Sequence, residues 1–268
     1  MSKSKTKRTE KKVSGTTEWA ASNVNIQSGC PNDCAYCYAK SMAIRFGRET
    51  CESWKEITLK QHKLDENYKK KEGTIMFPTT HDITTENLDE CLLVLHKLLG
   101  AGNKLLIVSK PDPKCIEKLC EELSEYKDQI LLRFTMGSAD NEVLKFWEPN
   151  APSFEDRVSA LKLAYDLGFE ASVSCEPMLD NHIEAVVEKV KEYVTDAIWI
   201  GLVNRLKQIV SVNCGKFEQE ADDLLELFSE ERIMELYELY KDNPTIKWKE
   251  SIKKIVGIEI PTQAGLDI

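Results

Sequence analysis

The 268-residue sequence contains no long apolar run, and no apolar stretch follows its basic start. A membrane-spanning helix needs roughly 18 uncharged apolar residues, and a secretory signal needs an apolar segment behind its positive charges. Hydrophobic residues still make up 42% of the chain and charged residues 30%, a balance that predicts a folded protein with a sizeable core. We therefore expect a soluble, cytoplasmic protein with no membrane partner.

The sequence also lacks internal repeats and, from residue 20 onward, any Gly/Ser-rich linker. We therefore expect a basic disordered tail over residues 1–16 and a single domain over residues 17–268. Residues 1–12 carry six basic side chains against Glu10, so this short segment holds a net charge of +5 in a chain of net charge −9. The remaining body is strongly acidic, which makes nucleic acid a weakly supported partner that depends on the tail.

Short β-rich runs alternate with longer helical patterns, which is typical of stacked βαβ units with a parallel sheet. Strands are expected over residues 23–27, 74–77, 105–108, 130–134, 171–175 and 197–200, with a last apolar run at 246–248 that closes or extends the sheet. Helices are expected over residues 39–46, 59–71, 85–99, 113–126, 153–168, 183–193 and 218–240. Six such units predict an α/β fold, a partial (β/α)6 TIM-type barrel with its chemistry on the loops at the carboxyl ends of the strands.

Nine cysteines, an odd number without a secretory signal, favour reduced thiols over a disulfide framework. Three of them, Cys30, Cys34 and Cys37, stand in a C-x3-C-x2-C spacing on a loop directly after the first expected strand. Such a loop can wrap one compact object and direct three sulfurs at it. Thiolates are the usual ligands of iron–sulfur clusters and an ordinary 4Fe–4S cluster takes four, so three leave one iron open to a substrate or cofactor.

A structural zinc site is the competing interpretation of this loop. Zinc normally takes four closed ligands, often in paired motifs, and here His62 and Cys51 are separate and irregularly spaced. Among the other cysteines, Cys175 at the end of the fifth expected strand is the best candidate for a further thiol in the site. Reduced helix or loop thiols are expected at Cys91, Cys115, Cys120 and Cys214.

The cysteine loop resembles the cluster motif of the radical S-adenosylmethionine (SAM) enzymes, C-x3-C-x-aromatic-C, with Tyr36 at the aromatic position. The resemblance covers essentially the whole chain beyond residue 20. It implies that the three cysteines bind a 4Fe–4S cluster whose open iron binds the amino and carboxylate groups of SAM. It also implies that a flavodoxin- or ferredoxin-type donor supplies one electron, which cleaves SAM to a 5′-deoxyadenosyl radical that abstracts hydrogen from a substrate.

Within that superfamily the chain is most similar to the spore photoproduct lyase group. Tyr36 and Tyr38 repeat a C-x-Y-C-Y run whose tyrosines lie near the substrate in the lyase, which implies a catalytic role for both. The lyase also uses a hydrogen-donating cysteine, which aligns with Thr79 of this chain. A threonine O–H bond is too strong to replace a thiol, so we expect a relative with another substrate. Further similarity lies in residues 146–153, Arg157, Gly168 and Glu176-Pro177.

The same resemblance implies which residues hold SAM. Thr80 and Lys110 correspond to a hydroxyl and a lysine at the carboxylate end of SAM, where a cation suits the carboxylate. Thr135 or Ser138, after the fourth expected strand, corresponds to a second hydroxyl position. The backbone around Glu176 corresponds to the segment that meets the adenine.

Two further loops carry side chains with two interpretations each. Asn204 and its neighbour Arg205 follow the sixth expected strand, where they either contact SAM ribose or an anionic substrate or cap the turn. His81 is either a general acid/base or a hydrogen-bonded structural residue. The alternatives for the whole chain are a non-catalytic iron–sulfur redox or sensor protein and a nucleic-acid repair lyase, the latter resting on the basic tail.

Overall fold

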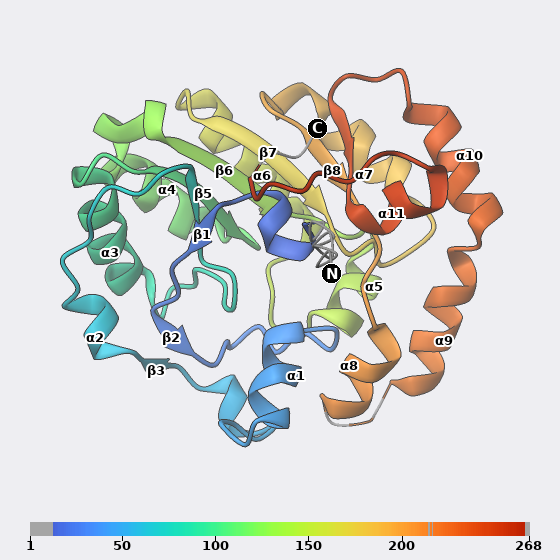
Figure 1. Cartoon of the computed structure of the whole chain (residues 1–268), viewed down its shortest axis with the longest axis horizontal. Coiled ribbons are helices and arrows are strands. Elements are labelled where there is room, and N and C mark those ends of the chain that lie inside the picture. Colours follow the sequence, from blue (N-terminus) through green and yellow to red (C-terminus); the bar gives the residue numbers. More distant parts are fainter. Residues whose placement is uncertain (1–12, 214, 216, 266–268) are drawn as a thin grey trace, which may run out of the picture.

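The structure, a computed structural model, describes residues 13–213, 215 and 217–265. Its centre is a seven-stranded sheet in which every pair of neighbouring strands is parallel (Figure 1). The strands run in chain order across the sheet, as in a partial TIM-type barrel, so the expected fold class is confirmed. In sheet order they are β1 (Ser22–Asn23), β4 (Thr74–Phe77), β5 (Lys104–Ser109), β6 (Ile130–Thr135), β7 (Glu170–Cys175), β8 (Ile198–Ile200) and β9 (Ile246–Trp248).

The two ends of this sheet differ from the expectation. The apolar run at residues 246–248 forms β9, which pairs with β8 and adds a seventh strand. The expected first strand, residues 23–27, is divided instead. Only β1 joins the main sheet, whereas β2 (Gln27–Ser28) pairs antiparallel with β3 (Thr58–Leu59) in a separate two-stranded sheet. The cysteine loop therefore follows β2 and not a strand of the barrel.

Helices connect the strands and cover the outer face of the sheet (Figure 1). Two of the expected helices differ from the structure. Residues 59–71 contain only a single helical turn. The expected helix 218–240 is two helices, and Ser229 is the N-cap of the second. The helices are α1 (Tyr38–Arg45), α2 (Gln61–Leu64), α3 (Leu88–Gly100), α4 (Pro113–Glu122), α5 (Asn141–Trp147), α6 (Phe154–Asp166), α7 (Ile183–Val190), α8 (Leu206–Val212), α9 (Glu218–Leu227), α10 (Glu230–Tyr240) and α11 (Glu250–Val256).

Side chains alternate between the two faces of the sheet, as the two-residue period of a strand requires. Ile75 and Phe77 of β4 belong to the large core between the sheet and the helices. Met76, between them, faces inward and packs with Leu106 of β5 and with Trp19. The inner face of the barrel is therefore closed partly by a side chain that comes from outside the sheet.

The interior of the barrel holds a cation between two indole rings. The Arg133 guanidinium of β6 lies 4.5 Å from the ring centroid of Trp19 and 5.2 Å from that of Trp199. Arg133 also donates from Nε to the Ser172 hydroxyl at 2.9 Å and pairs with Asp196 at 3.1 Å. These contacts offset the cost of burying a charge and form a floor across the barrel.

The residues before β1 form a short 3-10 helix, Gly15–Glu18, that lies across the centre of the barrel (Figure 1). Backbone hydrogen bonds from Val13 N to Pro261 O and from Gly265 N to Thr17 O join the two terminal segments. Residues 13–16, expected as the end of the tail, are thus part of the folded domain, and residues 1–12 lie outside the described residues. Among the described residues, none of the helices combines the length and the apolar character of a membrane span.

Candidate active site

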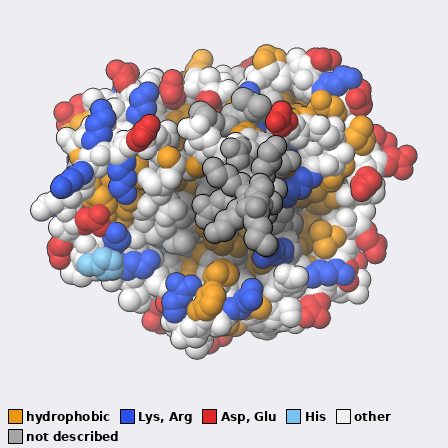
Figure 2. Space-filling model, in the orientation of Figure 1, with side chains coloured by type: hydrophobic (Ala, Val, Ile, Leu, Met, Phe, Trp, Pro, Cys, Tyr) orange, Lys and Arg blue, Asp and Glu red, His pale blue; other side chains and the backbone are white. Residues whose placement is uncertain are grey.

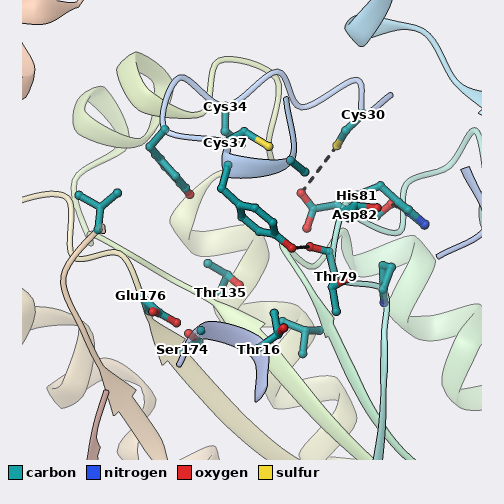
Figure 3. Close-up of a pocket in the computed structure, with 18 of the residues that line it drawn as sticks. Thr16, Cys30, Cys34, Cys37, Thr79, His81, Asp82, Thr135, Ser174 and Glu176 are labelled. Atoms are coloured by element: carbon teal, nitrogen blue, oxygen red, sulfur yellow. Dashed lines mark hydrogen bonds between the residues drawn. The ribbon is translucent and has the colours of Figure 1, made fainter. Parts of the chain in front are cut away.

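A cavity of about 470 Å³ opens at the carboxyl ends of the parallel strands (Figure 3). Because the strands run the same way, loops that are far apart in the chain meet at this edge. Most of the residues singled out from the sequence line the cavity: Cys30, Cys34, Tyr36, Cys37, Tyr38, Thr80, His81, Lys110, Thr135, Glu176 and Asn204.

The cysteine loop starts at a position that only glycine can occupy. Gly29 has a φ of +81°, and a Cβ atom there would lie 1.8 Å from the Glu56 carbonyl oxygen. The next residue, Cys30, donates its N–H to the Trp54 carbonyl oxygen at 2.8 Å. The loop is therefore fastened to the segment that precedes β3, and this close approach places Cys30 against the buried Trp54 ring.

The other end of the loop passes into a helix. Cys37 is the N-cap of α1, and its Sγ accepts a hydrogen bond from Lys40 N at 3.4 Å. The Asn213 side chain, from the end of α8, donates to the carbonyl oxygens of Ala35 and Cys37, both at 2.9 Å. The backbone between the second and third cysteines is thus held by a residue about 180 positions later in the chain.

The three loop thiols are free and face the cavity (Figure 3). Burial raises the pKa of each, and for Cys30, where the Asp82 charge adds to burial, the pKa rises to about 12. Metal binding at this loop would therefore release protons. No three His, Cys, Asp or Glu side chains of the described residues converge on a single ion. In a 4Fe–4S cluster each cysteine binds a different iron, so three thiols spread along one cavity wall fit that group.

Asp82 is the polar centre of the wall beside Cys30. One carboxylate oxygen accepts from Lys110 N at 2.9 Å, and the other accepts from Asn32 Nδ2 at 2.9 Å and lies 3.3 Å from Lys110 Nζ. Burial by itself raises the pKa of this carboxyl, but the Lys110 charge and the hydrogen bonds outweigh burial and lower the pKa below its usual value. Asp82 is therefore ionised and holds the Lys110 ammonium at the cavity.

A second buried carboxylate, Glu148, lies on the other side of Lys110. It pairs with Arg157 at 2.5 Å, accepts a hydrogen bond from the Tyr36 hydroxyl, and lies 4.0 Å from Lys110 Nζ. The side chains of Glu148 and Arg157 are fully buried. Burial lowers the pKa of Arg157, but the Glu148 carboxylate outweighs burial and raises it. Glu148 thus connects the aromatic residue of the cysteine loop to two cations.

The loop after β4 is fixed by a side chain from the segment after β1, the neighbouring strand of the sheet. Asn25 Oδ1 accepts from the backbone N–H groups of Thr79 and Thr80 at 2.7 and 3.0 Å, and its Nδ2 donates to Thr79 Oγ1 at 2.8 Å. The Tyr38 hydroxyl donates to the Thr79 carbonyl oxygen at 2.6 Å. Tyr38 and Thr79 are therefore neighbours in the cavity.

His81 has the features of a structural residue rather than of an acid/base group. Its Nε2 accepts from Ile26 N at 3.4 Å, and its Nδ1 lies 3.1 Å from the Asp82 carbonyl oxygen. Burial lowers the pKa of His81 to about 4, so the ring is neutral at pH 7. Because both nitrogens are engaged by the backbone, the suggested acid/base role is not supported.

The remaining expected residues divide between the cavity and the core. Thr135 lines the cavity, whereas Ser138 is buried and donates to the Asp180 carboxylate away from it. Glu176 lines the cavity, and burial raises the pKa of its carboxyl against the opposing charge of Lys249. Asn204 also lines it, with Nδ2 3.3 Å from Glu250 Oε1.

The cysteines outside the loop lie away from the cavity. Cys175, the candidate for a further thiol in the site, is the last residue of β7 and is buried in the large core. Cys91, Cys115 and Cys120 are buried free thiols, as expected. Cys51, in contrast, is disulfide-bonded, so the expectation of reduced thiols fails there. Cys214 lies outside the described residues.

The N-terminal turn contributes to the site, which the sequence did not predict. Thr16 and Trp19 line the cavity, opposite the cysteine loop (Figure 3 for Thr16). They precede the first strand, in a polar segment whose sequence predicts neither a helix nor a strand. The Ser14 capping position before Gly15–Glu18 is the one local signal that predicts an ordered turn there.

Comparison with known families and proteins points to the same superfamily as the cysteine motif. The sequence pattern described as Radical SAM superfamily matches residues 24–194, which is more than half of the chain. An uncharacterised protein, ORF301, of Acidianus two-tailed virus is 30% identical over 186 residues, covering 65% of this chain and 60% of the viral protein. The chain thus spans about three fifths of the length of that relative.

Two kinds of solved structure share the fold. A mutant of spore photoproduct lyase with a dinucleoside spore photoproduct has a TM-score of 0.56 and 14% identity, covering 90% of this chain and 79% of the lyase chain. Streptococcus suis SuiB bound to S-adenosylmethionine has a TM-score of 0.53 and 13% identity, covering 91% of this chain and 54% of the SuiB chain. At these identities the likeness concerns the fold.

Proposed function

Because the chain belongs to the Radical SAM superfamily, a superfamily of enzymes, we propose that it binds a 4Fe–4S cluster through Cys30, Cys34 and Cys37 and cleaves SAM. When bound, that cofactor pair supplies the chemistry: one electron cleaves SAM to methionine and a 5′-deoxyadenosyl radical, which abstracts hydrogen from the substrate. The observation that carries the proposal is the position of three free thiols of one loop in the same cavity as Lys110, Thr135 and Glu176.

The residues of the chain bind and orient in this proposal. Lys110 and Thr80 lie on neighbouring strand ends and would hold the carboxylate of the methionine moiety. Asp82 and Glu148 keep the Lys110 side chain charged, since their negative charges raise its pKa well above the usual value against the effect of burial. A fixed ammonium costs little reorganisation when an anion binds.

Two loops complete the pocket. The backbone around Glu176, after β7, would meet the adenine, and Asn204, after β8, would reach the ribose. Tyr36 and Tyr38 face the space between the cysteine loop and the loop after β4, where the substrate would approach. Enclosure by these loops excludes water from a reactive radical, which protects it from side reactions.

A photoproduct lyase activity is not proposed for this chain. Thr79 occupies the cavity where the lyase alignment places a hydrogen-donating cysteine, and its hydroxyl is already engaged by Asn25. The proposed activity is therefore hydrogen abstraction from another substrate.

The test is anaerobic reconstitution with iron and sulfide. We expect about four irons per chain in the wild type, and production of 5′-deoxyadenosine on addition of dithionite and SAM. Alanine at Cys30, Cys34 or Cys37 should abolish both. Cys120→Ala, which removes a buried free thiol on α4, should keep the cluster.

Two outcomes would contradict the proposal. A wild-type protein with a full cluster that releases no 5′-deoxyadenosine is not a SAM-cleaving enzyme. A cluster whose electron paramagnetic resonance spectrum does not change on addition of SAM would support the alternative of a non-catalytic iron–sulfur protein.

A further inference from the structure

The wall of the cavity opposite the cysteine loop carries three polar side chains that the proposed binding of SAM does not use. Thr16 comes from the N-terminal turn, Ser174 from β7 and Glu176 from the loop after β7, and Figure 3 shows all three on the side away from the cysteines. Ser174 and Glu176 are two residues apart, so the period of an extended chain puts both side chains on the inner face of the sheet. These three residues form the distal wall of the cavity.

The two hydroxyls of the distal wall lack partners. Within residues 13–213, 215 and 217–265, neither the Thr16 nor the Ser174 hydroxyl forms a hydrogen bond, although Ser174 is only 1% exposed. Ser172, two residues earlier on β7, shows the contrast, because its hydroxyl donates to the Ala197 carbonyl oxygen at 2.7 Å and accepts from Arg133 Nε at 2.9 Å. A buried hydroxyl without a partner in the protein indicates a ligand or an ordered water.

The Glu176 carboxylate also keeps capacity for a ligand. Its one ion pair among the described residues is with Lys249, whose Nζ lies 3.6 Å from Oε2, which is beyond hydrogen-bond distance. Lys249 makes closer contacts elsewhere, at 2.8 Å to Glu18 Oε1 and at 3.1 Å to the Gly15 carbonyl oxygen. Because an ionised carboxylate accepts on both oxygens, Glu176 can accept hydrogen bonds from a group inside the cavity.

The other charges that line the cavity are matched. Asp82 and Glu176 are the acids among the described lining residues, and Lys110 is the one lysine or arginine. Asp82 is paired with Lys110, which would hold the carboxylate of SAM, and the ring of His81 is neutral. A cationic group of a substrate would therefore find its counter-ion at Glu176.

Apolar side chains adjoin the distal wall. Trp19, Met76 and Val108 line the same cavity and pack together on the inner face of the barrel. The Trp19 ring already has Lys249 Nζ at 3.8 Å and the Arg133 guanidinium at 4.5 Å from its centroid, so a third cation on this ring would be repelled. Apolar surface beside one carboxylate and two hydroxyls suits a ligand whose carbon chain ends in a cation.

We propose that the distal wall binds a protonated primary amine of the substrate, with Glu176 as the counter-ion and the hydroxyls of Thr16 and Ser174 as acceptors. The inference rests on the proposed function and names the substrate class for that site. An ammonium group has three donors, one for each side chain of the wall, and hydrogen bonds of charged groups are stronger than those of neutral ones. The Glu176 charge adds to burial in raising the pKa of Tyr38, so the wall lies within reach of the tyrosine beside which the substrate would approach.

Two other classes of substrate fit less well. A carboxylate or phosphate at the distal wall would face the Glu176 charge, while the nearest ammonium, that of Lys249, is fully buried. A polyanion such as nucleic acid also requires a basic surface around the cavity. Figure 2 shows basic and acidic side chains interspersed over this face of the described chain.

The experiment uses the reconstituted full chain without reductant, so that binding is measured before any reaction. The probes are primary n-alkylamines of three, five and seven carbons, which are protonated near neutral pH, and the alcohols and carboxylates of the same lengths. Ligand-observed NMR measures their affinities with and without SAM. The variants are Glu176→Gln, Ser174→Ala and Thr16→Val. Glu170→Gln, at the exposed amino end of β7, and Ser159→Ala, at an exposed position of α6, serve as matched controls.

We expect the wild type to bind at least one amine about tenfold more tightly than the alcohol and the carboxylate of the same length, with or without SAM. Glu176→Gln should remove this preference, because the amide keeps the shape of the side chain and loses its charge. Ser174→Ala and Thr16→Val should each weaken amine binding about threefold to tenfold and leave the affinity for SAM at the wild-type value. Both controls should behave as the wild type.

The proposal is overturned if the wild type binds the alcohols or carboxylates as tightly as the amines, or if Glu176→Gln keeps the preference for the amine. It is also overturned if SAM displaces the amine, which would assign the distal wall to SAM itself. A failure of the proposed function is a separate result. It would appear as a wild type that forms no 5′-deoxyadenosine with SAM and dithionite, whichever probes it binds.

Discussion

The Lys249 ammonium lies 2.8 Å from Glu18 Oε1 and 3.8 Å from the Trp19 ring centroid, so the residue after the last strand holds the turn before the first. Lys249 Nζ also lies 3.1 Å from the Gly15 carbonyl oxygen and 3.6 Å from Glu176 Oε2. Gly201 permits this approach, because a Cβ there would lie 2.7 Å from the Lys249 side chain. One buried cation therefore connects the N-terminal turn to the cavity wall.

Replacement of Lys249 by methionine should be strongly destabilising. It removes the Lys249 ammonium from the buried Glu18 carboxylate, and removal of one partner of a buried ion pair costs about 3–5 kcal/mol. Lys191→Met is the matched control, because Lys191 and its partner Glu188 are 49% and 70% exposed, and a surface pair contributes about 0–1 kcal/mol. Urea denaturation measures both, and equal losses of unfolding free energy would refute the anchoring role.

Gly29→Ala should disturb the cysteine loop more than the strain of a positive φ alone would. The new Cβ meets the Glu56 carbonyl oxygen, which has to move. Gly47→Ala is the control, because Gly47 also has a positive φ, +64°, but open space around it, and should cost about 1–2 kcal/mol. Iron content after reconstitution should fall for the Gly29 variant alone. If both variants load the same amount of iron, the close approach at Gly29 does not shape the loop.

Glutamine at Glu148 should destabilise the wall behind the cysteine loop. Arg157 and Lys110 would each lose a carboxylate partner in a buried environment, which predicts a loss of about 3–5 kcal/mol. Glu184→Gln removes one of two carboxylate partners of Arg232, in a pair whose side chains are 22% and 33% exposed, and should cost about 0–1 kcal/mol. Thermal or urea unfolding separates the two cases, and a loss at Glu148 no larger than that at Glu184 contradicts the assignment.

The stability of the protein should depend on His81 between about pH 4 and 6.5. Burial lowers the pKa of His81 from its usual 6.5 to about 4, so in this range the unfolded chain binds a proton that the folded chain does not. The stabilisation is therefore fully present above pH 6.5 and is lost as the pH falls toward 4.

His81→Gln retains an acceptor for Ile26 N and removes the titration. Its unfolding free energy should fall with decreasing pH less steeply than that of the wild type, by up to about 1.4 kcal/mol per pH unit. Urea denaturation at pH 7.0, 5.5 and 4.5 measures the difference. His62→Gln, at an exposed position, should follow the wild type, and an unchanged slope in His81→Gln would show that His81 titrates normally.

The alternation of strands and helices and the position of the cysteine motif were predictable because both are local. A two-residue period marks the strands, capping residues such as Ser153 mark helix starts, and a C-x3-C-x2-C spacing needs no tertiary information. The predictions were wrong where a contact between residues far apart in the chain determines the structure. Residues 23–27 read as one strand, but Gln27 and Ser28 pair with β3 and not with the barrel.

The sequence by itself therefore determined the parallel α/β class, the position of the cysteine loop and most of the residues at the strand ends, because side-chain period and motif spacing are properties of neighbouring residues. Only the tertiary structure decided that Asp82 and Glu148 flank Lys110 and that Lys249 reaches Glu18. These contacts join positions far apart in the chain, and burial, not local sequence, sets which charges meet.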